Sequence, residues 1–439
     1  MSTPGVASPD AGPLDRPLNR KHVTAWALWD WGAASFNAVM VTFVFGTYLA
    51  SDAFGPDDRG TQWLTAANAI GGLVIALTAP IIGQRADAGG RRKLWLGLNT
   101  GVVIALTALC FLVTPEESSL LLGVMLIAAG NVAFEFAEVN YNAMLLQVST
   151  PKTIGKVSGL GWGAGYTGGI FLLLLLYVGF IAGDTHWFGV PNDEARNIRV
   201  VALFAAAWFL VFALPVLLPV PEHRASRPAG ARRSILASYR QLFRTIGGLW
   251  RHERNTFWFL VSSAVFRDGV GAIFTYGAIL GTTVYGVAAA DVLIFGIAAN
   301  VVAAAGSFLG GWIDDRIGPK RVIMGSLLGL IVTATIVFFL DGTTAFWIFG
   351  LTLCFFVGPV QSASRSFLGR LTTEDRAGEI YGLYATTGRA VSFLAPALIS
   401  AAIALTEDSR FMVPAILLVL IAGLILLVRV RDPKVDAGA

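Results

Sequence analysis

Charged residues are scarce in this sequence. Asp, Glu, Lys and Arg make up 14% of the 439 residues, whereas soluble proteins contain about 25%. Hydrophobic residues make up 55% of the chain, and its mean hydropathy is +0.67. This composition argues against an isolated secreted or cytosolic enzyme and predicts that most of the chain lies in a membrane.

Cysteine and histidine are also rare. The two cysteines, Cys110 and Cys354, lie inside apolar runs, which supports neither a disulfide framework nor a cysteine metal site. The four histidines fall in predicted loops or the tail, and no His, Cys and Asp cluster has metal-ligand spacing. We therefore expect no metal, no cofactor and no catalytic residue. The first 22 residues lack the apolar core of a cleaved signal peptide.

Long apolar segments are abundant. About twelve are long enough to cross a bilayer, which takes roughly 20 residues, and they must be helical because lipid cannot satisfy exposed backbone groups. The sequence therefore predicts an all-α membrane protein with about twelve transmembrane helices. The expected spans are 24–50, 62–83, 94–114, 119–146, 154–182, 198–220, 255–284, 290–312, 321–340, 344–369, 379–404 and 410–429.

A short charged motif occurs twice, about half the chain length apart. The first copy begins at Gly83 and reads Gly-x-x-x-Asp-x-x-Gly-Arg-Arg-Lys, and the second begins at Gly311. Glycine permits close helix contact and tight turns, and aspartate caps a helix or pairs with a basic group. We interpret both copies as gating loops; the alternative is that they only hold helix ends together. Their candidate residues are Gly83, Asp87, Gly90, Arg91, Arg92, Gly311, Asp315, Gly318, Lys320 and Arg321.

The duplication predicts two pseudo-symmetric six-helix bundles, at 23–220 and 255–430, with tails at 1–22 and 431–439. Most lysines and arginines fall in segments on one side of the predicted membrane, whereas the other loops are mostly acidic. Positive residues mark the cytoplasmic side, so we expect cytoplasmic termini and a bacterial-type inner membrane. This bias also explains the net charge of +4 without any nucleic acid partner.

The cytoplasmic segment 221–254 between the bundles contains a second pattern. Apolar residues recur at helical spacing from Ile235 to Trp250, with arginines filling much of the rest. This pattern predicts an amphipathic helix at the membrane interface. Such a helix either only tethers the halves or has a regulatory, lipid-sensing role.

Ionisable residues inside the spans are candidates for a site, because each costs about 2.5–3.5 kcal/mol at mid-bilayer. In the fourth span, Asn131, Glu135, Glu138 and Asn142 form one polar stripe on an apolar helix. The stripe predicts a cavity lining; the alternative is a buried contact with a neighbouring helix.

The second half has basic residues at the matching positions. Aligning Gly155 with Gly378 matches Glu138 to Gln361, Asn142 to Arg365 and Tyr166 to Arg389. Transporter sites lie near the midplane between halves. We therefore hypothesise a cavity with carboxylates on one wall and guanidiniums on the other, suited to a zwitterion such as an amino acid. Alternatively, Glu135 or Glu138 pairs with Arg365 or Arg389 across the interface.

Two further acidic residues occupy equivalent places in the first and seventh spans. Asp30 and Asp268 are each followed by glycine and small residues, then phenylalanine, and Arg267 beside Asp268 predicts a local ion pair. Because no histidine lies in the membrane, proton coupling would have to use Asp30, Glu135, Glu138 or Asp268.

The repeated loop resembles the conserved loop of the major facilitator superfamily. Several segments resemble its vacuole-effluxer-like branch, namely 25–36, 138–143, 155–169 and 267–269. Fungal members of that branch are associated with amino-acid release from vacuoles. The resemblance implies a solute transporter, with amino-acid efflux as an analogy. We expect a monomer that moves a small polar solute by alternating access, with proton-coupled efflux as one form of that transport. The alternatives are a lipid flippase, a transporter-derived sensor and a membrane enzyme.

Overall fold

The computed structural model describes residues 18–55, 59–183, 186–222 and 235–432. Within these residues the structure has twelve helices that are long and apolar enough to cross a membrane, which confirms the predicted all-α membrane fold. The predicted tails and interbundle segment extend beyond this part of the chain, because 1–17, 223–234 and 433–439 lie outside the described residues.

The first half contains six spans, two of which include a π-helix. The first passes from α1 (Arg20–Ala34) through a π-helix (Ser35–Phe43) to α2 (Phe45–Leu49), and the fifth passes from α7 (Ile154–Leu176) to a π-helix (Tyr177–Ile181). The remaining spans are formed by α3 (Arg59–Gly89), α4 (Arg92–Leu109), α5 (Glu117–Ala143) followed by α6 (Leu145–Val148), and α8 (Arg196–Leu217).

The second half also contains six spans. They are formed by α10 (Arg254–Thr283), α11 (Ala289–Ile317), α12 (Pro319–Phe339), α13 (Thr343–Leu371), the broken pair α14 (Ala377–Val391) and α15 (Leu394–Thr406), and α16 (Met412–Val428). The helix α9 (Ile235–His252) precedes them and belongs to neither set of spans.

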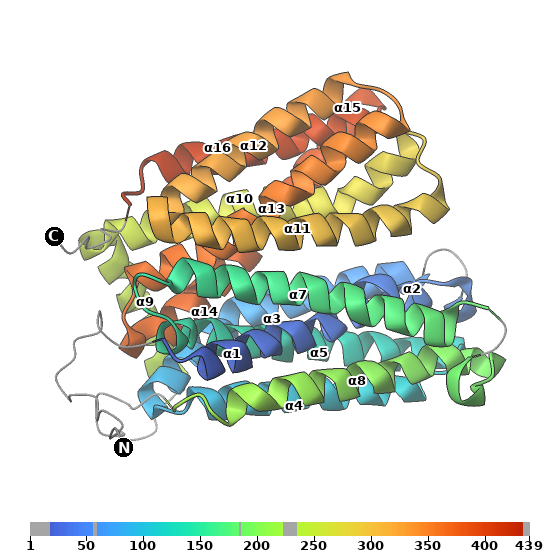
Figure 1. Ribbon diagram of the computed structural model, residues 1–439, viewed down its shortest axis with the longest axis horizontal. Helices are drawn as coiled ribbons and strands as arrows, with labels where there is room; N and C mark the ends of the chain where they lie inside the picture. The colour runs from blue at the N-terminus through green and yellow to red at the C-terminus, as the bar shows by residue number, and fades with distance from the viewer. Residues whose placement is uncertain (1–17, 56–58, 184–185, 223–234, 433–439) are drawn as a thin grey trace, which may run out of the picture.

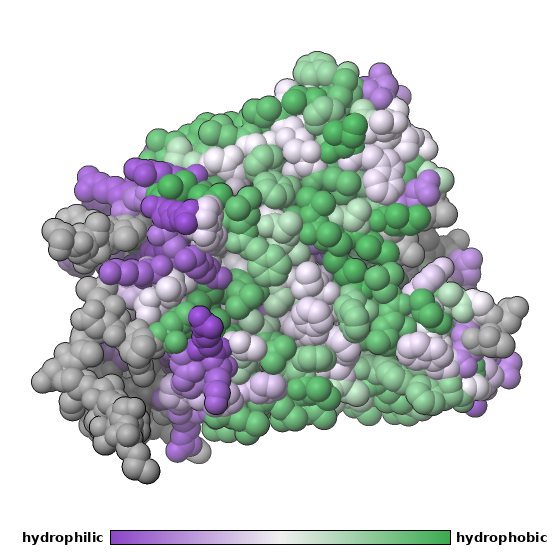
Figure 2. All heavy atoms as spheres, in the orientation of Figure 1, coloured by the Kyte–Doolittle hydropathy of each residue, from purple (hydrophilic) through white to green (hydrophobic). Residues whose placement is uncertain are grey.

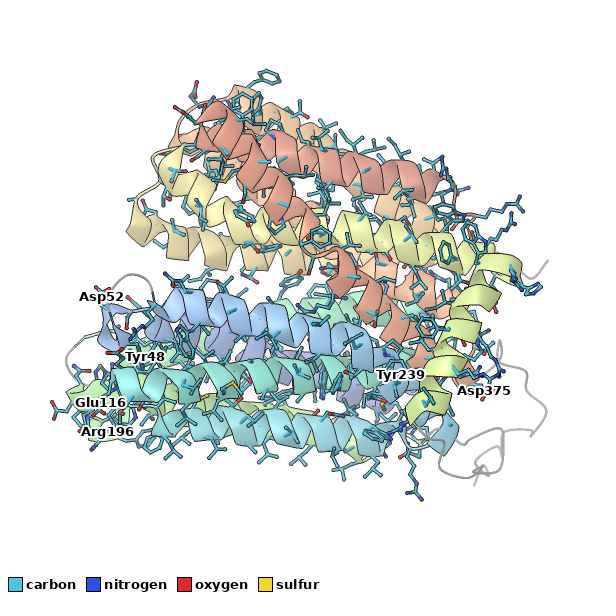
Figure 3. All side chains as sticks on the ribbon, turned by 180° about the vertical axis from the view of Figure 1, so that it is seen from behind. Tyr48, Asp52, Glu116, Arg196, Tyr239 and Asp375 are labelled. Carbon is cyan, nitrogen blue, oxygen red and sulfur yellow. The ribbon has the colours of Figure 1, made fainter. Side chains whose placement is uncertain are left out.

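Two helix pairs form the most extensive contacts between the halves: α7 packs against α11, and α3 packs against α14 (Figure 1). α7 also packs against α13, and α5 also packs against α14. Both α1 and α16 have their chain-terminal ends at one end of the bundle, which we call the basic end because its turns include Arg91, Lys93 and Arg321. The other end, with Asp52 and Glu116, is the acidic end (Figure 3).

The surface matches the membrane assignment. In Figure 2 the middle of the molecule is largely hydrophobic, and hydrophilic side chains gather at the two ends. Large apolar side chains are exposed on spans of both halves, among them Ile70, Leu98, Val332 and Leu418. Such exposure is expected where the surrounding solvent is lipid.

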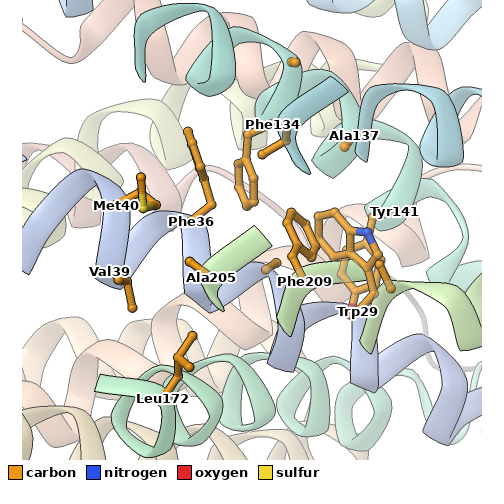
Figure 4. Packing of buried hydrophobic residues seen from close by; sticks show 14 of the residues in the cluster. Trp29, Phe36, Val39, Met40, Phe134, Ala137, Tyr141, Leu172, Ala205 and Phe209 are labelled. Atoms are coloured by element: carbon orange, nitrogen blue, oxygen red, sulfur yellow. The ribbon is translucent and has the colours of Figure 1, made fainter. Parts of the chain in front are cut away.

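An aromatic core fixes the helices that hold the first-half site. Trp29 of α1 stacks on Tyr141 of α5 with ring centroids 4.3 Å apart, and Phe36 stacks on Phe134 at 5.5 Å (Figure 4). Phe209 of α8 closes the same cluster, with an edge contact to Trp29. Aromatic pairs of this kind each add about 0.5–1.5 kcal/mol beyond area burial, so α1 and α5 are held in a fixed register.

Candidate functional site

The polar stripe of α5 faces the second half. Glu135 forms an ion pair with Arg389 of α14, and these side chains retain 18% and 30% exposure. Farther along the stripe, the Asn142 Oδ1 accepts a hydrogen bond of 3.3 Å from the Arg365 Nη1. Asn131 is half-buried at the other end of the stripe. Glu135 and Asn142 of the stripe therefore contact side chains of the second half rather than lipid.

Arg365 of α13 is the most heavily bonded side chain between the halves. Its Nη1 donates to the Asp30 Oδ2 at 3.2 Å, its Nη2 donates to the Ser158 carbonyl oxygen at 2.7 Å, and its Nε donates to the Ser158 hydroxyl at 3.0 Å. The side chain is only 4% exposed. A guanidinium has five donors in a fixed fork, and here they join α13 to α1, α5 and α7.

Aromatic rings of the first half enclose the same guanidinium. It lies 4.8 Å from the Trp26 ring centroid and 5.6 Å from those of Tyr141 and Trp162. The Tyr141 hydroxyl also donates to the Asp30 Oδ2 at 2.8 Å. A Cβ at Gly161 would lie 2.5 Å from the Arg365 Nη2, so only glycine leaves room for this cage.

Sequence reasoning overlooked Ser158, Tyr141 and Trp26. Ser158 is a small residue in the glycine-rich start of α7, and Tyr141 lies beside the polar stripe rather than on it. The sequence offered only an indirect indication of Trp26 and Tyr141. Trp26 lies one helical turn before the candidate Asp30, and Tyr141 directly precedes the candidate Asn142. Their contacts with Arg365 depend on how the two halves dock.

Glu138 and Arg267 have weaker partners than the other ionisable residues of the site. The Glu138 Oε1 accepts a hydrogen bond of 3.5 Å from the Asn142 amide. The Arg267 guanidinium lies 3.9 Å from the Tyr384 ring centroid, and its Nη1 donates to the Tyr384 carbonyl oxygen at 3.5 Å. Both side chains are half-buried, and Glu138 lies within electrostatic reach of Arg267. Gln361 is half-buried on α13, one turn before Arg365.

The expected ion pair between Arg267 and Asp268 is not formed between these two described side chains. Instead, the Asp268 Oδ2 accepts a hydrogen bond of 2.6 Å from the Ala395 amide, at the start of α15. Consecutive helical residues point about 100° apart, which explains their separation. Asp268 caps the second segment of the broken eleventh span, whereas Asp30 pairs across the halves.

At the basic end, Asp87 joins the two halves. Its Oδ1 and Oδ2 accept hydrogen bonds from the Gly378 and Glu379 amides at 3.1 and 2.9 Å, in the first turn of α14. The buried Arg92 donates to the same carboxylate from its Nε at 2.8 Å. A carboxylate at a helix N-terminus is stabilised by orphan N–H groups and the helix dipole.

Asp315 makes the symmetry-related contact in the opposite direction. Its Oδ1 and Oδ2 accept hydrogen bonds from the Gly155 and Lys156 amides at 2.7 and 2.9 Å, in the first turn of α7. The Arg370 Nη2 donates to Asp315 at 3.1 Å, and Arg370 also pairs with the neighbouring Asp314. The duplicated aspartates thus each hold the N-terminus of a helix from the other half.

The glycines of both loops lie where a side chain would not fit. A Cβ at Gly83 would lie 1.9 Å from the Gly378 carbonyl oxygen, and one at Gly311 would lie 2.5 Å from the Gly155 carbonyl oxygen. Gly90 has φ of 59° and Gly318 has φ of 92°, values that favour glycine. The remaining basic side chains described in the two loops form no hydrogen bond or ion pair with Asp87 or Asp315. Arg91 and Arg321 are exposed, and the Lys320 Nζ donates to the Val428 carbonyl oxygen at 3.2 Å.

The polar contacts described here occupy one part of the interface. They run from the basic end to the Glu135–Arg389 pair, which lies farthest from that end along α5 and α14. The ribbons of the two halves come together at the basic end and diverge toward the acidic end (Figure 3). The conformation is therefore one in which the basic end is closed.

Comparison with known proteins agrees with this architecture. Residues 147–438 match the family described as Vacuole effluxer Atg22 like. An uncharacterized MFS-type transporter of Bacillus subtilis is 26% identical over 94% of this chain and 95% of its own length. Autophagy-related protein 22 of Pyricularia oryzae is 26% identical over 66% of this chain, and the match spans 45% of that longer relative.

Solved structures of major facilitator transporters share the fold. FucP in the outward conformation has a TM-score of 0.70 and 15% identity, covering 94% of this chain and all of the FucP chain. The proton:xylose symporter XylE has a TM-score of 0.72 and 14% identity, covering 94% and 96%. Taken with the duplicated six-helix bundles, these matches show a membrane transport protein, and the chain belongs to the Vacuole effluxer Atg22 like family of major facilitator transporters.

Proposed function

We propose that this protein moves a small zwitterionic solute, of which an amino acid is the leading candidate, through a central cavity by alternating access. The charge distribution between the halves supports the proposal. Asp30, Glu135 and Glu138 come from the first half, whereas Arg267, Arg365 and Arg389 come from the second. A solute with an ammonium and a carboxylate complements both walls at once.

The observation that carries the proposal is the sparse bonding of Glu138 and Arg267. Asp30–Arg365 and Glu135–Arg389 are already paired across the interface, so their charges are neutralised in this conformation. Among the described residues, Glu138 accepts one hydrogen bond of 3.5 Å, and Arg267 donates one of 3.5 Å and lies over the Tyr384 ring, and neither forms an ion pair. Charges inside a membrane are costly unless paired; in our proposal the solute ammonium binds Glu138 and the solute carboxylate binds Arg267.

The paired residues then act in the conformational cycle. With the basic end facing the cytoplasm, as its positive charge favours, the described conformation opens toward the outside. Opening the cytoplasmic side separates Arg365 from Asp30 and releases the helix contacts of Asp87 and Asp315. A solute that neutralises the walls reduces the cost of that separation, and this links binding to movement.

Proton coupling is part of the proposal and uses a carboxylate. Glu138 is the candidate proton acceptor because it lies on the solute path and has no ion pair among the described residues. Protonation of Glu138 would compete with binding of the solute ammonium. This competition would exchange a proton for the solute and would favour export when the outside is acidic.

Counterflow in proteoliposomes tests the proposal. Vesicles containing the purified protein are loaded with one unlabelled amino acid or one neutral sugar. Uptake of the same compound in labelled form is then measured, with and without an imposed pH gradient. We expect exchange of at least one zwitterionic amino acid and no exchange of neutral sugars. Glu138→Gln and Arg267→Gln should both abolish exchange, whereas the exposed control Glu116→Gln should not. Full exchange in both site variants would reject the proposed binding residues.

A further inference from the structure

The helix α9 presents three different faces. Ser238, Leu242, Thr245 and Leu249 are buried against the bundle. A second face is exposed and apolar: Leu236, Phe243 and Trp250 recur every seven residues and are 78%, 70% and 48% exposed. A third face holds the exposed Arg240, Arg244 and Arg251, and α9 contains no acidic residue. At about 100° per residue, the apolar face lies between the buried face and the arginines.

The position of α9 places the apolar face beside the membrane. α9 runs crosswise to the spanning helices at the basic end, with Tyr239 on it (Figure 3). The Tyr239 hydroxyl donates to the Leu77 carbonyl oxygen of α3 at 3.1 Å, so the helix lies against the flank of a span. Trp250 also contacts Phe257 and Trp258 of α10, at 5.0 and 6.1 Å between ring centroids. Aromatic clusters of this kind mark the headgroup level of a bilayer.

The buried face of α9 is bonded to the interface between the halves. The Thr245 hydroxyl donates to the Glu379 Oε1 of α14 at 2.7 Å, and the Gln84 amide of α3 donates to the same oxygen at 3.1 Å. The Glu379 amide in turn donates to Asp87. One carboxylate thus joins α9 to both halves, next to the contact that closes the basic end.

We propose that α9 binds anionic phospholipids of the adjacent leaflet and that this binding favours the conformation closed at the basic end. Leu236, Phe243 and Trp250 enter the acyl boundary, and the three arginines contact lipid phosphates. Apolar insertion combined with attraction to anionic lipid is the general mode of interfacial helices. Opening requires α3 and α14 to separate. This separation breaks the hydrogen bond between Gln84 and Glu379 and changes the surface on which α9 packs through Thr245. The proposal requires only the transporter fold and is independent of the solute.

Contact with lipid is tested on the full chain in vesicles. Cys110 and Cys354, both buried and free, are replaced by serine, and Phe243→Cys is labelled with an environment-sensitive dye. Brominated acyl chains should quench this dye strongly, as they should at the lipid-exposed control Leu328→Cys, and should not quench it at the control Arg20→Cys, which is exposed at the first residue of α1. Absence of quenching at position 243 in every vesicle composition would overturn the proposal and would indicate that the face is in water or covered by protein.

The effect on the gate is tested by a distance measurement. Spin labels at Arg85→Cys and Arg321→Cys, exposed at the basic ends of opposite halves, report opening. Adding phosphatidylglycerol to phosphatidylcholine vesicles should increase the population at the short distance. Arg240→Gln/Arg244→Gln/Arg251→Gln should lose this response, whereas removing the same charge with Arg20→Gln/Lys21→Gln/Lys152→Gln should preserve it.

A second variant separates lipid binding from its consequence. Thr245→Val should retain quenching at position 243 and lose the phosphatidylglycerol response of the distance, because it removes the bond to Glu379. An unchanged response in both the arginine variant and Thr245→Val would contradict the proposed coupling. Failure of the solute assay would leave these measurements unaffected, since neither uses transport.

Discussion

Arg365 and Asp30 belong to opposite halves of the chain, and the Arg365 Nη1 donates a hydrogen bond to the Asp30 Oδ2 at 3.2 Å. The pair links α13 of the second half to α1 of the first half. Its charges neutralise each other while the basic end is closed. The same two residues must part when that end opens, so the pair connects site chemistry with conformation.

Removing Arg365 should therefore affect both stability and transport. Arg365→Ala leaves Asp30 without its cation, and loss of one partner from a buried ion pair costs about 3–5 kcal/mol. Because the Asp30 side chain is 19% exposed, we expect the lower part of that range. Thermal unfolding of the purified variant should occur at a lower temperature, and transport at matched surface amounts should fall by about tenfold or more.

The double variant Asp30→Asn/Arg365→Gln is the matched control. It removes both charges, so it should be more stable than Arg365→Ala while remaining inactive in transport. If Arg365→Ala unfolds at the wild-type temperature, the pair does not contribute to stability as described.

Gly83 should not tolerate a methyl group. Gly83→Ala would put a Cβ 1.9 Å from the Gly378 carbonyl oxygen, so α3 and α14 must separate at a cost of about 1–3 kcal/mol. Spin labels across the basic end should report a larger open population. Gly72→Ala on the same helix meets nothing within 4 Å and should leave the distances unchanged. Equal behaviour of the two variants would contradict close packing at Gly83.

The two gating aspartates should differ in spite of their symmetry. Asp87→Asn removes the carboxylate charge that pairs with Arg92, and that arginine side chain is 0% exposed. After Asp315→Asn, Arg370 still pairs with Asp314. We therefore expect Asp87→Asn to lower the unfolding temperature more than Asp315→Asn. The reverse order in thermal unfolding would be inconsistent with these contacts.

Exchanging the two residues of the Glu135–Arg389 pair should preserve their ion pair. Each single variant, Glu135→Arg or Arg389→Glu, places like charges opposite each other across the interface. The double exchange restores attraction and should recover part of the folded, surface-expressed protein that each single variant loses. No recovery in the double variant would show that the two side chains do not interact in the membrane.

The spans and the duplication could be predicted because they depend on local composition and on a repeated motif. Twelve long apolar runs must be helices in lipid, and the second copy of the Gly83 motif at Gly311 marks the second half. The helical spacing of apolar residues between Ile235 and Trp250 likewise predicts a helix where α9 is observed.

The bonding partners within the site could not be predicted in the same way. The sequence offered an ion pair of Glu135 or Glu138 with Arg365 or Arg389, and Glu135–Arg389 is one of those pairings. It did not predict that Arg365 would instead bond Asp30 and Ser158. Those choices depend on the docking of α13 and α14 against the first half. The error over Arg267 and Asp268 has a local cause, since neighbouring residues on a helix diverge.

Alternating access through this site requires a water-filled space between the halves that opens at the acidic end. In the Cys110→Ser/Cys354→Ser background, Asn131→Cys tests it directly with a membrane-impermeant thiol reagent applied to either side of sealed vesicles. Val102→Cys, which is 42% exposed on α4 toward lipid, is the control and should not react. We expect the reagent to modify position 131 from the acidic-end side alone. A cysteine at position 131 that reacts from neither side, or only from the basic-end side, would contradict this expectation.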